Sequence, residues 1–252
     1  MEFLILGLFA FAAGFIDSVA GGGGLIQLPG LMLVFPGVPF PVLAGTNKLS
    51  SICGTTYAAY RYKKDLKFDK RVLVAAVPCA LLASWFGARF VSYLNPALVK
   101  PVVIVSLLIV GLYTAFKPKL GDIKPKEKPA KAIYISSALI GLVIGFYDGF
   151  IGPGTGSFLI FAFIMMLGLD FLHASASAKI VNIATNIAAI GYFVSTGQFL
   201  PWHALVMGLA NICGSALGTK MALDKGNEWI KKVFLVSVTI LLGKLIWDIS
   251  KG

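Results

Sequence analysis

Four ionisable side chains stand inside stretches of sequence that are otherwise apolar: Asp17, Lys48, Asp148 and Lys179. Adding 131 to each of the first two positions gives the other two. A charge at the centre of a lipid bilayer costs about 2.5–3.5 kcal/mol on insertion scales, so four cost on the order of 10 kcal/mol. A chain that places such charges at matching positions is expected to use them.

A cluster of glycines begins four residues after each aspartate, at 21–24 and at 152–156. Such a run ends a helix and frees backbone N–H groups, which a membrane tolerates only where they line a cavity or bind something. A helix that begins after the cluster directs the positive end of its dipole at that cavity. This pattern favours an anion site, with close glycine packing between helices as the alternative. The residues predicted for the site are Gly22, Gly23, Gly154 and Thr155.

Each lysine stands near the start of an apolar segment, among small residues with hydroxyl or amide side chains. An oxyanion is bound well by such a set, because the ammonium supplies charge while hydroxyl and amide groups donate hydrogen bonds. The alternative is that each lysine lies near the membrane surface and extends its ammonium to water. The predicted anion ligands are Thr46, Asn47, Lys48, Ser177, Lys179 and Asn182.

Asp17 and Asp148 can act in such a site in three ways. Each can neutralise a lysine, accept hydrogen bonds from a helix end, or take up and release a proton during transport. The alternative is a purely structural ion pair that holds the two halves of the chain in register.

The rest of the sequence places these residues in a membrane. Of 252 residues, 58% are hydrophobic and 13% are charged, and the mean hydropathy is +0.86. Apolar segments that can cross about 30 Å of hydrocarbon recur along the chain, which predicts an all-α integral membrane protein of the cytoplasmic membrane. Eight long segments cover 3–20, 43–60, 72–93, 98–116, 132–151, 175–193, 203–219 and 233–249, and two short ones cover 25–35 and 157–169.

The offset of 131 also divides the chain into a first transmembrane repeat (1–116), a basic cytoplasmic linker (117–131) and a second transmembrane repeat (132–252). Eleven helical residues reach roughly 17 Å, so the short segments either dip into the membrane and return or complete thin crossings. The first case makes the repeats parallel, with 13 loop Lys and Arg residues inside and 6 outside. The second makes them inverted, with 16 inside and 3 outside. The positive-inside rule favours inversion.

Several classes of function are disfavoured. The net charge of +11 lies in loops, where the positive-inside rule accounts for it, so no nucleic-acid partner is expected. Cys53, Cys79 and Cys213 fall singly in apolar segments without metal-ligand spacing. No nucleophile and base can be paired, so we expect neither an enzyme, nor a cofactor, nor a metal site. The expected partners are a small anion and the bilayer, and a homo-oligomer is left open.

Specific motifs accompany the four charges. Gly-Phe-Ile-Asp-Ser-Val-Ala-Gly-Gly-Gly-Gly at 14–24 and Ala-Gly-Thr-Asn-Lys-Leu at 44–49 resemble the TauE/SafE sulfite-exporter family of membrane proteins. Gly-Phe-Tyr-Asp-Gly-Phe-Ile-Gly-Pro-Gly-Thr-Gly at 145–156 and Ala-Asn-Ile-Cys-Gly-Ser-Ala-Leu-Gly at 210–218 extend the resemblance over essentially the whole chain. It implies export or uptake of small sulfur-containing anions, such as sulfite, sulfonates and thiosulfate, at the residues named above. Asn47 corresponds to Ala178 at the offset of 131, so the site is expected to be asymmetric.

The expected function is therefore a secondary transporter of such anions, which works by alternating access with its site between the two repeats. One alternative is an anion channel, which would not saturate or couple to a proton gradient. Another is an assembly or sensor subunit of the membrane that transports nothing.

Overall fold

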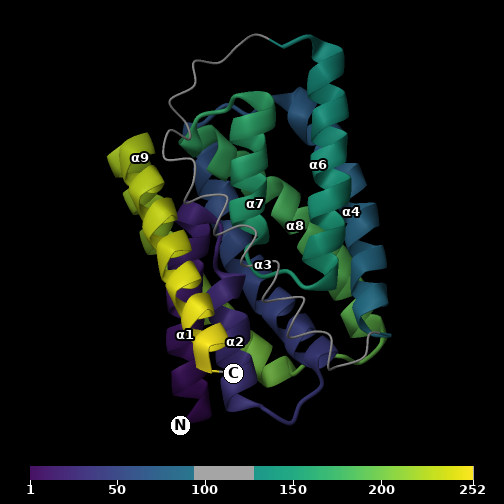
Figure 1. Cartoon of the computed structure of the whole chain (residues 1–252), viewed down its shortest axis with the longest axis vertical. Helices are drawn as coiled ribbons and strands as arrows, with labels where there is room; N and C mark the ends of the chain where they lie inside the picture. Colours follow the sequence, from purple (N-terminus) through teal and green to yellow (C-terminus); the bar gives the residue numbers. More distant parts are fainter. Residues whose placement is uncertain (94–127, 252) are drawn as a thin grey trace.

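The computed structural model describes residues 1–93 and 128–251, and this part of the chain is helical, without a β-strand (Figure 1). The all-α class expected from the sequence is confirmed there. The helices are α1 (Glu2–Ala20), α2 (Gly24–Val34), α3 (Phe40–Asp65), α4 (Lys70–Val91), α6 (Ala130–Phe150), α7 (Thr155–Ala162), α8 (Phe171–Ser195) and α9 (Pro201–Lys251), and a short π-helix, η1 (Phe163–Leu167), continues α7. Below, the N-terminal part means residues 1–93 and the C-terminal part means residues 128–251.

Glycine and aspartate residues set several helix ends. Gly21 ends α1 with φ at +77°, a left-handed conformation that suits glycine. Gly226, with φ at +68°, interrupts α9, so the predicted segments 203–219 and 233–249 fall on its two arms. Asp69 and Asp170 precede α4 and α8, and each side chain accepts a hydrogen bond from a backbone N–H in the first turn.

Five helices of the described ranges are long and apolar enough to cross a membrane: α1, α4, α6, α8 and the Pro201–Val233 stretch of α9. The apolar helices Gly24–Val34 and Thr155–Leu167 are shorter. α3 has 26 residues, but polar side chains such as Asn47 and Lys48 make it less apolar than the other five. The predicted segment 98–116 lies outside the described residues, so the total of eight long crossings stays a prediction.

The helices of each part pack mainly against helices of the other part. α1 packs along α9 and α6 packs along α4, while α3 contacts α9 and α8 contacts α4. α3 and α8 also contact each other. Every one of these contacts joins the N-terminal part to the C-terminal part, so neither part forms a separate core.

Glycines let these helices approach closely. A Cβ atom added to Gly14 of α1 would lie 2.2 Å from the backbone carbonyl oxygen of Asn211 in α9. A Cβ added to Gly145 of α6 would lie 2.7 Å from the backbone of Ala80 in α4. Gly14 and Gly145 match at the offset of 131, and so do the residues that they contact, Ala80 and Asn211. Close backbone packing of this kind is a main source of helix association in a bilayer.

Side-chain contacts show which helix ends lie together. Glu2 and His203 form a hydrogen bond of 3.2 Å, which places the starts of α1 and α9 side by side. Asn227 accepts a hydrogen bond from the Leu172 N–H at 2.7 Å, which places the interruption of α9 beside the start of α8. Figure 1 shows α1 beginning at the bottom of the molecule and α6 beginning at the top. The first helices of the two parts therefore run in opposite directions.

The loop between α1 and α2 touches the loop between α6 and α7 in the interior. The Ser157 N–H donates to the Gly21 carbonyl at 2.9 Å, and the Ser157 hydroxyl donates to the Ala20 carbonyl at 2.8 Å. A Cβ on Gly21 would lie 2.2 Å from the backbone of Gly156. The two glycine clusters therefore meet backbone to backbone, which only residues without side chains allow.

Candidate functional site

Two buried ion pairs cross between the N-terminal and C-terminal parts. Lys48 Nζ in α3 lies 2.6 Å from Asp148 Oδ1 in α6, and Lys179 Nζ in α8 lies 3.0 Å from Asp17 Oδ2 in α1. Each lysine thus pairs with the aspartate of the other part. The lysine side chains are only 4% and 0% exposed, which contradicts the alternative that they extend to water at the membrane surface.

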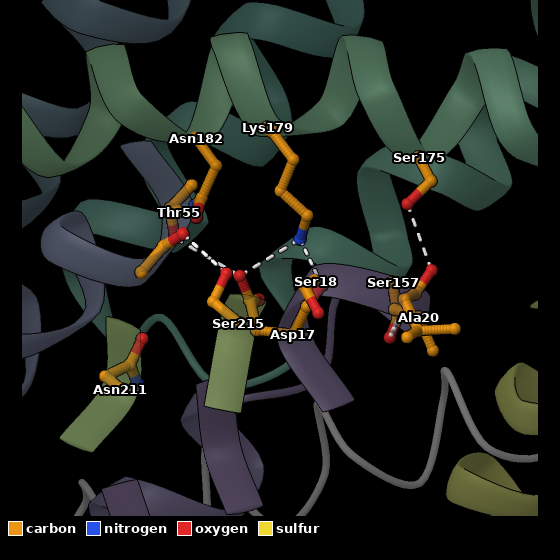
Figure 2. Close-up of polar contacts among 12 residues, drawn as sticks. Asp17, Ser18, Ala20, Thr55, Ser157, Ser175, Lys179, Asn182, Asn211 and Ser215 are labelled. Atoms are coloured by element: carbon orange, nitrogen blue, oxygen red, sulfur yellow. Dashed lines mark hydrogen bonds and ion pairs between the residues drawn. The ribbon is translucent and has the colours of Figure 1, made fainter. Parts of the chain in front are cut away.

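The Lys179–Asp17 pair is held by several hydrogen bonds. Lys179 donates to the Asp17 backbone carbonyl as well as to its carboxylate. The Thr55 hydroxyl lies 3.2 Å from the same carboxylate oxygen and donates to it, as Figure 2 shows. Because Asp17 stands in the last turn of α1, the Lys179 ammonium also lies at the negative end of that helix dipole.

The Lys48–Asp148 pair has a different setting. Asn182 Nδ2 lies 3.5 Å from Asp148 Oδ2, a long hydrogen bond. A Cβ added to Gly152 would lie 3.1 Å from Lys48 Nζ, so the ammonium rests against the second glycine cluster. The Asp148 side chain is 2% exposed. This pair thus depends mainly on the single short contact between ammonium and carboxylate.

A small polar cavity lies where these elements converge. Its volume is about 20 Å³, room for about one water molecule. The lining residues come from both parts of the chain and are mostly charged, amide, hydroxyl or glycine residues. They are Asp17, Gly21, Gly24, Asn47, Lys48, Ser51, Asp148, Gly152, Gly154, Thr155, Gly156, Asn182 and Asn186.

The glycine clusters bring two helix starts to this cavity, as the sequence predicted. α2 begins at Gly24 and α7 begins at Thr155, and both residues line the cavity. The Thr155 hydroxyl donates to the Gly152 carbonyl at 2.7 Å, which closes the turn before α7. Each helix start carries about half a positive charge, so both favour a negative ligand.

Seven of the twelve residues expected at the site line the cavity, and five lie outside it. Gly23 packs against α1, because a Cβ there would lie 2.6 Å from the Ala13 carbonyl oxygen. The Thr46 hydroxyl donates to the Val42 carbonyl and accepts from the Leu200 N–H, which ties α3 to the start of α9. The five residues outside the lining are Gly22, Gly23, Thr46, Ser177 and Lys179, the last of which reaches the cavity through Asp17.

Two side chains that line the cavity, Ser51 and Asn186, were not predicted from the sequence. At the offset of 131, Ser51 corresponds to Asn182, and Thr55 corresponds to Asn186. Asn186 Nδ2 donates to Asn182 Oδ1 at 3.3 Å, one turn along α8. Applying this offset to the predicted ligand Asn182 would have found Ser51, and Asn186 stands one turn after Asn182 on the same helix. In the described residues the buried Asn47 Oδ1 has no hydrogen-bond partner.

The family profile described as "Sulfite exporter TauE/SafE" matches residues 6–245, almost the whole chain. The chain belongs to the TauE/SafE family. This TauE/SafE member is 34% identical over 244 residues to a probable membrane transporter protein of Haemophilus influenzae, covering 97% of this chain and 94% of the relative. It is 32% identical over 252 residues to the probable membrane transporter protein YfcA of Escherichia coli K12, covering 97% and 91%. No solved structure matches it.

A more distant TauE/SafE relative, the probable membrane transporter protein YdhB of Bacillus subtilis, is 24% identical over 243 residues, covering 94% of this chain and 96% of the relative. These relatives are named as transporters rather than enzymes. The resemblance expected from the sequence motifs is confirmed, and with it a multi-pass membrane transporter of the TauE/SafE family.

Proposed function

We propose that this TauE/SafE transporter is a secondary carrier of small sulfur-containing anions, of the sulfite, sulfonate or thiosulfate class, in the cytoplasmic membrane. The observation that carries the proposal is the cavity. The Lys48 ammonium, the amide groups of Asn47 and Asn182 and the starts of α2 and α7 converge on it. Ammonium, amide donors and helix starts together suit an oxyanion, and the family description names sulfite.

The carrier is built, in this proposal, from two inverted repeats, 1–116 and 132–252, joined by the basic linker 117–131. Matching contacts support this reading. The Ser84 hydroxyl donates to the Thr185 carbonyl at 2.8 Å, and the Ser215 hydroxyl donates to the Gly54 carbonyl at 2.7 Å. The two donors match at the offset of 131, and so do the two acceptors. The crossed ion pairs follow the same offset, and α1 and α6 run in opposite directions.

The basic loops support one orientation in the membrane. Sixteen Lys and Arg residues lie in 61–71, 117–131 and 220–232, against three in the other loops, so we place the three basic loops in the cytoplasm. Single cysteines introduced at Glu2 and Gln198 should then react with an impermeant thiol reagent in intact cells, whereas cysteines at Lys128 and Asn227 should react only after the cells are opened. Labelling of Gln198 and Lys128 from the same side would refute the inverted arrangement.

The size and the place of the cavity support alternating access. A space for about one water molecule is too small for an oxyanion with several heavy atoms, so the elements around it must move apart to admit one. Binding sites between inverted repeats are opened to one side at a time by movement of one repeat against the other. Uptake should therefore saturate, and labelled anion outside should exchange for unlabelled anion inside, which separates a carrier from a channel.

The proposal is tested with the purified full-length chain. Thermal melting is measured with sulfite, thiosulfate, taurine, sulfoacetate, sulfate and chloride, followed by exchange in proteoliposomes. We expect at least one sulfur-containing anion to raise the melting temperature and to exchange, and Lys48→Ala to abolish both effects. The matched control is Lys128→Ala, because Lys128 is half-buried and its ammonium contacts the Met166 carbonyl away from the cavity. Stabilisation without exchange would favour a sensor, and no response to any sulfur-containing anion would refute the substrate class.

A further inference from the structure

The charges around the cavity already balance without a ligand. Lys48 and Lys179 are matched by Asp148 and Asp17, and each ammonium lies 2.6–3.0 Å from its carboxylate. An anion that binds Lys48 must therefore share the ammonium with the Asp148 carboxylate. Two negative groups at one buried cation repel each other, and the usual relief is that one of them takes up a proton.

The two pairs differ in how easily an anion can replace the carboxylate. Both members of the Lys48–Asp148 pair line the cavity, whereas Lys179 does not. Lys179 is fixed by two acceptors on Asp17, and Thr55 donates to the same carboxylate. Apart from Lys48, the Asp148 carboxylate has among the described residues only one long hydrogen bond, from Asn182 Nδ2 at 3.5 Å. The Lys48–Asp148 pair is thus placed so that an anion can replace the carboxylate, whereas the Lys179–Asp17 pair is placed to stay intact.

We propose that Asp148 carries the proton that is transported together with the anion, while the Lys179–Asp17 pair remains intact through the cycle. The inference rests on the proposed function and adds the coupling ion to it. A proton from the solution on the side to which the cavity opens binds an Asp148 carboxylate oxygen. The neutral carboxyl releases Lys48, and the anion takes its place at the ammonium. On the other side the anion and the proton leave, and the ion pair re-forms.

Among the described residues that line the cavity, Asp17 is the one other carboxylate, and it is held by Lys179 and Thr55. α7 and η1 contain no titratable side chain. α4 carries Arg89, which is exposed. α8 brings Lys179, which is paired with Asp17. On α6 itself, the Tyr147 hydroxyl donates to the Pro153 carbonyl at 2.7 Å. The proton balance of the Lys48 site therefore belongs to Asp148.

The coupling makes a quantitative prediction. One proton that moves with each singly charged anion makes the cycle electrically neutral. At equilibrium the anion should then accumulate about tenfold per unit of pH difference across the membrane, because one pH unit corresponds to 1.36 kcal/mol per proton. A doubly charged anion with one proton would in addition respond to the membrane potential.

The experiment uses full-length protein in proteoliposomes that contain a pH-sensitive dye. Each anion of the panel above is tested separately as the probe, and two properties are measured: anion exchange without a gradient, and accumulation driven by a pH difference. The anion's own protonation cancels when variants are compared with the same anion. Asp148→Asn should lose the pH-driven accumulation, even where some exchange remains. Asp17→Asn is the matched control, which should insert less protein or exchange more slowly but accumulate the anion to the same ratio per pH unit.

The outcomes separate the two proposals. Net uptake of a singly charged anion by the wild type without proton movement would overturn the coupling but leave the carrier intact. Loss of coupling in Asp17→Asn but not in Asp148→Asn would overturn the assignment to Asp148. No exchange of any anion by the wild type would overturn the proposed function and the coupling with it. If Asp148→Asn fails to fold, the ratio of protons to anions in the wild type still decides, since a ratio of zero refutes the coupling.

Discussion

The helices α3 and α8 occupy matching places in the two parts of the chain, and they agree where they contact other helices and differ where they line the cavity. Each carries a lysine that pairs with an aspartate of the other part, and each accepts a serine hydroxyl at a matching position. The polar side chains beside the cavity do not match: Asn47 corresponds to Ala178, Ser51 to Asn182, and Thr55 to Asn186. Contacts that hold the helices together match in the two parts, whereas the polar side chains that can meet a ligand differ.

The largest expected effects come from the two ion pairs. Removing one partner of a buried pair costs about 3–5 kcal/mol, whereas neutralising both is often tolerated. Lys179→Met should therefore lower the melting temperature strongly, and adding Asp17→Asn should restore stability and transport. Lys48→Met with Asp148→Asn should restore stability alone, because this pair is proposed to bind the anion and the proton. Melting and anion uptake of the two single and two double variants measure the difference.

Recovery of transport in both double variants would remove the distinction between the pairs. Recovery in Lys48→Met/Asp148→Asn alone would reverse it, and would make the Lys179–Asp17 pair the one that exchanges. Lys128→Ala serves again as the control for loss of a positive charge outside the cavity.

The glycines at the helix crossings test whether the helix packing is equivalent in the two parts of the chain. Gly14→Ala and Gly145→Ala both place a methyl group less than 3.0 Å from backbone atoms of another helix. Overpacking of this kind costs about 1–3 kcal/mol, and Gly14→Ala should cost more because its clash is the closer one. Gly7→Ala on α1 meets no atom within 4 Å and should leave the melting temperature unchanged or raise it. Sensitivity at only one of the two crossings would show that the packing is not equivalent.

Asn47 tests the difference between the polar side chains of α3 and α8 beside the cavity. Its buried Oδ1 has no partner among the described residues, and the Gln27 side chain contacts its backbone carbonyl rather than its amide. Asn47→Ala, which copies Ala178, should therefore leave the melting temperature nearly unchanged. It should raise the half-saturating anion concentration by about 2–10-fold, the worth of one neutral hydrogen bond. A large loss of stability with unchanged affinity would make Asn47 a structural residue.

The smallest effect concerns the starts of α4 and α9. Asp69 caps α4, and the hydrogen bonds from Arg71 lower the pKa of Asp69 below its ordinary value, whereas the matching position before α9 is Leu200. Because the pKa is lowered in the folded state, the stabilisation is present above the ordinary value of about 3.9 and is lost as pH falls through the lowered one. Asp69→Ala should cost about 1 kcal/mol near neutral pH, and its melting temperature should approach that of the wild type in acid. A constant difference at all pH values would exclude the carboxylate as its cause.

The sequence was informative where a pattern has one physical outcome. Long apolar segments must become helices in a membrane, and the described helices follow the predicted segments closely. The lysines and aspartates were identified for the same reason, because charge in an apolar segment is costly. Their partners were not, since Lys48 could have paired with Asp17 in its own part or with Asp148 in the other. Only the packing of α3 against the C-terminal helices decides between them.

Hydroxyl and amide residues were harder to place because they have several ways to be satisfied. Thr46 looked like an anion ligand, but its hydroxyl binds the Val42 carbonyl one turn earlier in its own helix. Ser51 was not predicted as an anion ligand, and its place in the cavity depends on the rotation of α3 within the bundle. Rotation of a helix is set by its neighbours, which a hydropathy pattern with buried polar residues on several faces does not specify.

The crossed ion pairs also affect how the protein is made. Each pair joins a residue of the first half of the chain to one of the second, so Asp148 is synthesised well after Lys48, and Lys179 well after Asp17. At about 5–20 residues per second, the ribosome delivers Lys48 roughly 5–20 s before its partner. Throughout that interval the nascent N-terminal part holds both of its buried charges without their final counter-ions. We therefore expect the first half to reach its final packing only after the second half of the chain has left the ribosome.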